Sequence, residues 1–106
     1  MVKIFPWKKN TPHKKLSVIK ALVVAGDVRA TASAFLGARE LGIHDLAAMC
    51  SVVLTLNSTD FYKSMTTHSD HRIWQDVYRT TMASGADVYI KLTVMDDVLI
   101  VSFKEL

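Results

Sequence analysis

The sequence predicts an α+β domain in which helices pack on one face of a mainly antiparallel β-sheet. Three observations lead to this fold class. Apolar residues recur at helical spacing in the first half of the chain, whereas from Asp60 onward they follow a period of two. The last two predicted strands are separated by a short turn, which favours antiparallel pairing. The chain has 106 residues, enough for a single domain over 1–106 with one core.

Three helices are predicted in the first half of the chain. The first is expected to begin at Thr11 and Pro12, because a hydroxyl cap followed by proline is typical of a helix start, and to end at Gly26. Thr31 and Asp45 are predicted to cap the second and third helices. The second helix is rich in alanine, so we expect it to pack closely against a flat surface.

The second half of the chain reads as strands, because β-branched and aromatic residues are frequent there and alternate with polar ones. Asp96 and Asp97 are predicted to form a two-residue hairpin turn between the last two strands. The expected strands are Phe61–Thr67, Ile73–Arg79, Val88–Met95 and Val98–Phe103.

This two-residue turn predicts the register of the last two strands. Met95 would face Val98, and Tyr89 would face Lys104. One side of the hairpin would then be entirely apolar and would pack on the helices, while Tyr89, Lys91 and Lys104 would share the other side. The apolar side would hold Val88, Ile90, Leu92, Val94, Leu99, Val101 and Phe103.

The same alternation divides the two earlier strands. Lys63 is predicted to share a side with Phe61 and Met65, whereas Tyr62 takes the opposite side. On the next strand Gln75 and Arg79 share a side. The sequence leaves open which side of each strand joins the polar face of the hairpin. If the sides of Lys63 and Gln75 do so, one surface holds Lys63, Gln75, Arg79, Tyr89, Lys91 and Lys104.

Positive charge is concentrated at the beginning of the chain. The formal net charge is +3, and six lysines precede Asp27, which is the first acidic residue. Residues 1–10 are predicted to be a basic N-terminal extension. This distribution fits either a solvated arm and helix face or a surface that attracts phosphate groups.

Several classes of protein are not favoured by the sequence. Cys50 is the single cysteine, and no secretory leader is evident, so we expect a cytoplasmic protein without an internal disulfide. No apolar run is long enough for a membrane helix. His68 and His71 flank Asp70, but a third protein ligand at suitable spacing is missing, so we expect no metal. No glycine-rich phosphate loop is present, so we expect no nucleotide or other small-molecule cofactor.

The polar face has side chains suited to cleavage of RNA. Attack by the 2′-hydroxyl on the adjacent phosphate requires positioning, proton transfer and stabilisation of negative charge, and it needs no metal. Lysine, arginine, tyrosine and glutamine can supply these functions, and clustered cations would lower the pKa of a lysine or tyrosine among them. The alternative is that these side chains only make a sheet face soluble.

Two segments carry a resemblance to a known family. The first is Asp60–Thr67 followed by Ser69–His71 and Ile73–Arg79, and the second is the ending Asp97–Glu105. These segments resemble the MqsR (motility quorum-sensing regulator) toxins, and the similarity extends from Thr11 over nearly the whole chain. The resemblance implies a RelE/YoeB-like fold and the toxin of a type II toxin–antitoxin pair. It also implies metal-independent cleavage of mRNA at GC-containing triplets.

The resemblance further implies particular residues and partners. Lys63, Gln75 and Tyr89 match residues proposed as catalytic in the family. The expected partners are mRNA and an MqsA-like antitoxin with a zinc-binding domain and a helix-turn-helix domain. The alternative function is a non-catalytic module that binds RNA or antitoxin and modulates transcription. The residues expected to bind RNA or phosphate are Tyr62, Met65, Arg79, Lys91 and Lys104.

Overall fold

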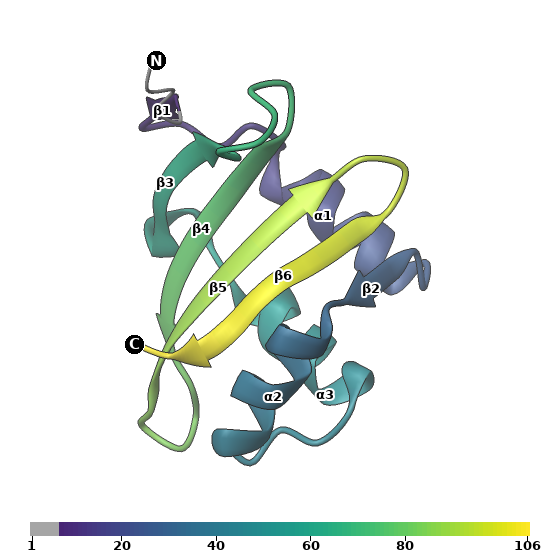
Figure 1. Cartoon of the computed structure of the whole chain (residues 1–106). Helices are drawn as coiled ribbons and strands as arrows, with labels where there is room; N and C mark the ends of the chain where they lie inside the picture. The colour runs from purple at the N-terminus through teal and green to yellow at the C-terminus, as the bar shows by residue number, and fades with distance from the viewer. Residues whose placement is uncertain (1–6) are drawn as a thin grey trace.

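The structure is a computed structural model that describes residues 7–106, in which three α-helices cover one face of a six-stranded sheet (Figure 1). The strand order is β1-β3-β4-β5-β6-β2, and all pairs are antiparallel except β2 with β6. This confirms the predicted α+β class. The elements are β1 (Lys8–Lys9), α1 (Leu16–Val24), β2 (Val28–Ala30), α2 (Ala32–Glu40), α3 (Leu46–Thr55), the 3₁₀ turn η1 (Ser58–Asp60), β3 (Phe61–Thr66), β4 (Trp74–Thr81), β5 (Asp87–Val94) and β6 (Val98–Glu105).

The helix ends follow the predicted capping residues, with one exception. The side chains of Thr31 and Asp45 accept hydrogen bonds from backbone N–H groups in the first turns of α2 and α3. Gly26 follows α1 with a φ of 84°, a conformation that favours glycine. In the part of the chain that the structure describes, no helix is long and apolar enough to cross a membrane.

The prediction that α1 begins at Thr11 and Pro12 is wrong. The helix begins at Leu16, and Lys15 before it is extended. The reason is a long-range contact: the backbone N–H groups of His13 and Lys14 donate to the carboxylate of Asp76 in β4. This contact holds the segment against the sheet in a non-helical conformation.

The core lies between the helices and the covered face of the sheet. Its fully buried side chains come from all three helices and from β4, β5 and β6. Burial of this apolar area, at about 25 cal/mol per Å², is the main favourable contribution to folding. The buried apolar residues of β5 and β6 are Val88, Ile90, Leu92, Val98, Ile100 and Phe103.

Part of the predicted hairpin register is wrong. The turn contains three residues, Met95–Asp97, so Val94 rather than Met95 pairs with Val98. A bulge then leaves Val101 without a partner and restores the predicted pairing of Tyr89 with Lys104. Consequently Val98 and Ile100 are buried, whereas Leu99 and Val101, which were expected in the core, are only partly buried.

A second bulge changes the faces of β3. Phe61 pairs with Tyr78 and Lys63 pairs with Val77, so Tyr62 lies between two ladder pairs without a partner. The ring of Phe61 packs edge-on against the ring of Tyr78 in the core, with 5.6 Å between their centroids. The prediction that Phe61 and Lys63 share a side, with Tyr62 opposite, is therefore wrong.

The alanine-rich helix α2 packs very closely on β6, as its composition predicted. Ala34 and Ala38 are fully buried. Gly37 comes so near to the sheet that a Cβ atom at this position would lie 2.1 Å from the carbonyl oxygen of Phe103. That distance is far inside van der Waals contact, so only glycine fits.

The substitution Gly37→Ala is expected to destabilise the fold by at least about 2 kcal/mol, because backbone must shift to admit the methyl group. In an exposed helix the same change would stabilise by about 1 kcal/mol. Gly26→Ala is the matched control: its Cβ would meet nothing within 4 Å, so only the strain of a positive φ is expected, about 1 kcal/mol. Urea denaturation of both variants measures the difference, and a stabilised Gly37→Ala variant would contradict the packing.

Candidate functional site on the open sheet face

The face of the sheet opposite the helices, called the open face here, is not covered by a helix in Figure 1. The strand pairing places an ordered array of polar side chains on it. The strand pairing places them in rows. In one row Arg79 of β4 lies beside Tyr89 of β5, which lies beside Lys104 of β6. Side chains that are directly opposed on neighbouring strands have Cβ atoms about 4.5–5.5 Å apart, so these three residues form a continuous line across the sheet.

A second row lies next to the first along the strands. Lys63 pairs with Val77, Val77 pairs with Lys91, and Lys91 pairs with Ser102. Val77 has no exposed surface although it points away from the helices. The two lysines beside it in the ladder are partly buried, which fits aliphatic stems that cover Val77 and leave the ammonium groups near solvent.

A third row contains Met65 and Gln75, which are paired across β3 and β4. Both are partly buried. Gln75 and Arg79 are four residues apart on the same strand, which corresponds to about 13 Å. Gln75 therefore lies at the other end of the array from Tyr89, so the open face is long enough to contact several nucleotides.

The structure thus answers the question that the alternation left open. All eight residues singled out from the sequence project from the open face, and Tyr62 is among them because of the bulge in β3. They do not converge on one point but cover three neighbouring rows. These residues are Tyr62, Lys63, Met65, Gln75, Arg79, Tyr89, Lys91 and Lys104.

Aromatic rings and cations are interleaved on the open face. The guanidinium carbon of Arg79 lies 3.6 Å from the ring centroid of Tyr62, and the Nζ atom of Lys63 lies 5.4 Å from the same centroid. The Nζ atom of Lys104 lies 5.1 Å from the ring centroid of Tyr89. These separations are within the range of cation–π attraction. The tyrosine rings therefore hold the cations in place without neutralising them.

The electrostatic environment shifts the pKa values of Lys91 and Tyr89 in opposite directions. The pKa of Lys91 is lowered by burial and by the positive charges of Lys104 and Lys63. The pKa of Tyr89 is raised, because burial outweighs the opposing effect of Arg79. Nearby cations therefore lower the pKa of both groups, as expected, but at Tyr89 the effect of burial is larger and the net shift is upward.

Lys8 also belongs to the open face, although the sequence did not indicate this. Lys8 pairs with Met65, which places its side chain on the same face, and it is exposed. Alternation could not reveal this, because β1 contains only two residues. The separate concentration of lysines near the N-terminus was the only sequence signal.

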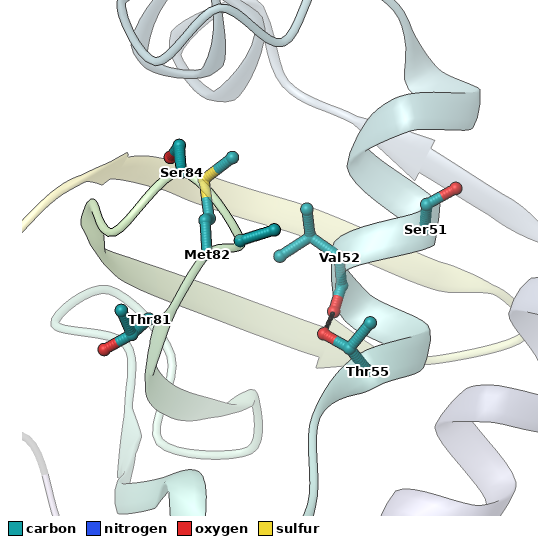
Figure 2. Close-up of a pocket in the computed structure, with 7 residues that line it drawn as sticks. Ser51, Val52, Thr55, Thr81, Met82 and Ser84 are labelled. Atoms are coloured by element: carbon teal, nitrogen blue, oxygen red, sulfur yellow. Dashed lines mark hydrogen bonds between the residues drawn. The ribbon is translucent and has the colours of Figure 1, made fainter.

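A hollow elsewhere on the protein lacks the features of an active site. It has a volume of about 320 Å³ and lies between α3 and the turn that joins β4 to β5. Figure 2 shows Val52 and Met82 on its walls, together with serine and threonine hydroxyls but without an ionisable side chain. Within residues 7–106, no cluster of three or more His, Cys, Asp or Glu side chains is suited to hold a metal ion.

Comparison with known proteins identifies the family. Residues 11–105 match the family model described as motility quorum-sensing regulator, toxin of MqsA. The chain is 60% identical over 98 residues to the mRNA interferase toxin MqsR of Escherichia coli (strain K12), a match that covers 92% of this chain and 98% of that protein. The chain therefore belongs to the MqsR toxin family, as its resemblance predicted.

The Lys104→Met substitution is expected to raise the pKa of Lys91, because it removes one of the two cations that disfavour the charged amine. NMR titration of the Lys91 side chain measures this shift. In the wild type, Lys91 of the folded protein loses its proton at a lower pH than Lys91 of the unfolded chain. Between these two pKa values the unfolded chain holds one more proton, so the free energy of unfolding should rise with pH. Lys15→Met, at the exposed start of α1, is the control. An unchanged Lys91 pKa in Lys104→Met would contradict the proposed coupling.

Proposed function

We propose that this chain is the toxin of a toxin–antitoxin pair and acts as an mRNA endoribonuclease. The 60% identity to an mRNA interferase toxin, which extends over almost the full length of both proteins, supports this activity. The observation that carries the chemistry is the row Arg79, Tyr89 and Lys104 beside the lysine pair Lys63 and Lys91. Such a surface supplies positive charge and proton-transfer groups together.

The proposed reaction is a metal-independent transesterification. The 2′-oxygen attacks the adjacent phosphorus, the bond from phosphorus to the 5′-oxygen breaks, and the products carry a 2′,3′-cyclic phosphate and a 5′-hydroxyl. One proton must leave the attacking 2′-hydroxyl and one must reach the departing 5′-oxygen. The ammonium groups of Lys63 and Lys104 would stabilise the additional negative charge on the phosphate.

The directions of the pKa shifts favour an assignment of the proton transfers. Tyr89, whose pKa is raised, stays protonated at neutral pH and is suited to donate a proton or a hydrogen bond. Lys91, whose pKa is lowered, gives up its proton more readily than an ordinary lysine and is suited to accept one. Losing either transfer would reduce the rate, typically by 10²–10⁴-fold.

The remaining residues of the open face would position the RNA. Gln75, at the far end of the array, is proposed to orient a base or phosphate of a nearby nucleotide by hydrogen bonding. Tyr62 is 45% exposed and has Arg79 against its ring, so it offers a surface on which a base can stack. Met65 and Arg79 would contact the same strand of RNA.

The substrate sequence and the partner are proposals that rest on the family resemblance. We propose cleavage at GC-containing triplets of mRNA in the cytoplasm. We propose further that an MqsA-like antitoxin, with a zinc-binding domain and a helix-turn-helix domain, neutralises this chain. Growth arrest on expression, relieved by co-expression of the neighbouring antitoxin gene, would support the pairing.

Purified protein is expected to cleave mRNA in the presence of EDTA and to leave 2′,3′-cyclic phosphate ends. Lys63→Ala should lower the cleavage rate because it removes charge stabilisation, and Tyr89→Phe should lower it by about 10²–10⁴-fold because it removes the proton donor. Lys15→Ala, which changes the same charge on the helix side, is the control and should cleave at the wild-type rate.

Two outcomes would overturn the assignment. Full activity in Lys63→Ala would exclude the proposed centre. RNA that is bound in a salt-sensitive manner but never cleaved would instead favour a non-catalytic RNA-binding module.

A further inference from the structure

We propose that the N-terminal arm, Trp7–Lys9, is an additional binding site for single-stranded RNA that extends beyond the cleaved bond. In this site the ring of Trp7 stacks on a base and the ammonium group of Lys8 contacts a phosphate. The inference rests on the function proposed above and adds a subsite to it. The matched family region begins at residue 11, so the arm lies outside it.

Lys8 of the arm continues the open face of the sheet. Strand β1 extends the sheet beside β3, and Lys8 pairs with Met65, which pairs with Gln75. Lys8 therefore lengthens the third row by one strand, at the end of the array that is farthest from Lys104. An RNA strand that crosses the rows from β6 toward β3 would reach Lys8 next.

Trp7 is an exposed tryptophan whose backbone is fixed by hydrogen bonds. Trp7 has 60% of its surface exposed. Its N–H donates to the Oγ1 atom of Thr66 at 2.7 Å, and its carbonyl oxygen accepts from the N–H of Thr66 at 2.8 Å. The ring lies beside His71, with 5.0 Å between centroids. Because Trp7 is bonded to Thr66, whereas Lys8 pairs with Met65, its ring lies on the other side of the edge strand from Lys8. An RNA strand that leaves the open face at Lys8 would therefore pass around this edge to reach Trp7. A large exposed ring on an ordered backbone is the kind of surface on which bases of single-stranded RNA stack.

The arm and the segment that follows it are held against the sheet before any ligand binds. The carboxylate of Asp76 accepts hydrogen bonds from the backbone N–H groups of His13 and Lys14, at 3.0–3.1 Å, and from the hydroxyl of Ser64 at 2.6 Å. The Nζ atom of Lys9 lies 4.2 Å from the ring centroid of Trp74, and the ring of His13 stacks on that ring at 5.4 Å. Binding of RNA would therefore cost little ordering of the arm.

The positive charge of the arm and of the segment that follows it favours RNA over a protein partner. Residues 7–14 contain three lysines and no acidic residue, and the lysine array of the open face continues this charge. A polyanion such as RNA is attracted by both surfaces at once. The antitoxin is the alternative occupant, and the experiment below distinguishes the two.

The test compares RNA binding by Trp7→Ala, Lys8→Ala and the control Lys15→Ala. The probes are RNAs that carry one cleavage triplet, with a 2′-deoxy nucleotide at the scissile position to prevent cleavage. One RNA has about five nucleotides, and two have about twenty, extended on the 5′ or the 3′ side. Trp7→Ala should raise the Kd for one long RNA roughly 5- to 100-fold, as expected for loss of one stacked base. Lys8→Ala should reduce the salt dependence of log Kd for that RNA by about 0.7.

The Kd for the short RNA, and the cleavage of a short all-ribose RNA, should be unchanged in Trp7→Ala and in the control Lys15→Ala. Arm variants that bind both long RNAs like the wild type would overturn the inference, as would variants that lose affinity for the antitoxin only. If the arm variants bind a long RNA more weakly than the wild type does, but the wild type cleaves no RNA, only the proposed function would be overturned. Thermal melting of each variant checks that the fold is retained.

Discussion

The burial of one face of the sheet is the constraint on which the rest of this structure depends. Successive side chains of a strand point to opposite faces, so apolar residues that pack on the helices force their neighbours onto the open face. In β5, burial of Val88, Ile90 and Leu92 leaves Tyr89 and Lys91 outside the core. The same pattern that stabilises the fold thus places a phenol and an amine on one ordered surface.

The two bulges show where this constraint was readable in the sequence and where it was not. The pairing of Tyr89 with Lys104 was predicted correctly, although the predicted turn was one residue too short. The bulge at Val101 compensates for this error. The bulge at Tyr62 brings this ring onto the open face against the prediction. Alternation counts residues, so one unpaired residue in a strand cannot be detected from local sequence.

Contacts between distant segments determine two further features that could not be predicted from the sequence, the start of α1 and the lowered pKa of Lys91. Local signals were sufficient for the caps at Thr31 and Asp45 and for the close packing of α2. The start of α1 depends instead on Asp76, which is more than sixty positions away from His13. The pKa of Lys91 is likewise lowered by burial in the assembled sheet and by lysines from two other strands. Lysine residues are recognisable in a sequence, but their mutual distances are set only by the assembled sheet.

The central claim is that RNA lies across the open face, with its scissile phosphate among the cations around Tyr89. NMR chemical-shift mapping with a non-cleavable RNA that carries a 2′-deoxy scissile nucleotide tests this most directly. The account predicts that the largest shifts fall on β4, β5 and β6 around Arg79, Tyr89, Lys91 and Lys104. Shifts confined to α1 and α3, with the strands unaffected, would contradict it.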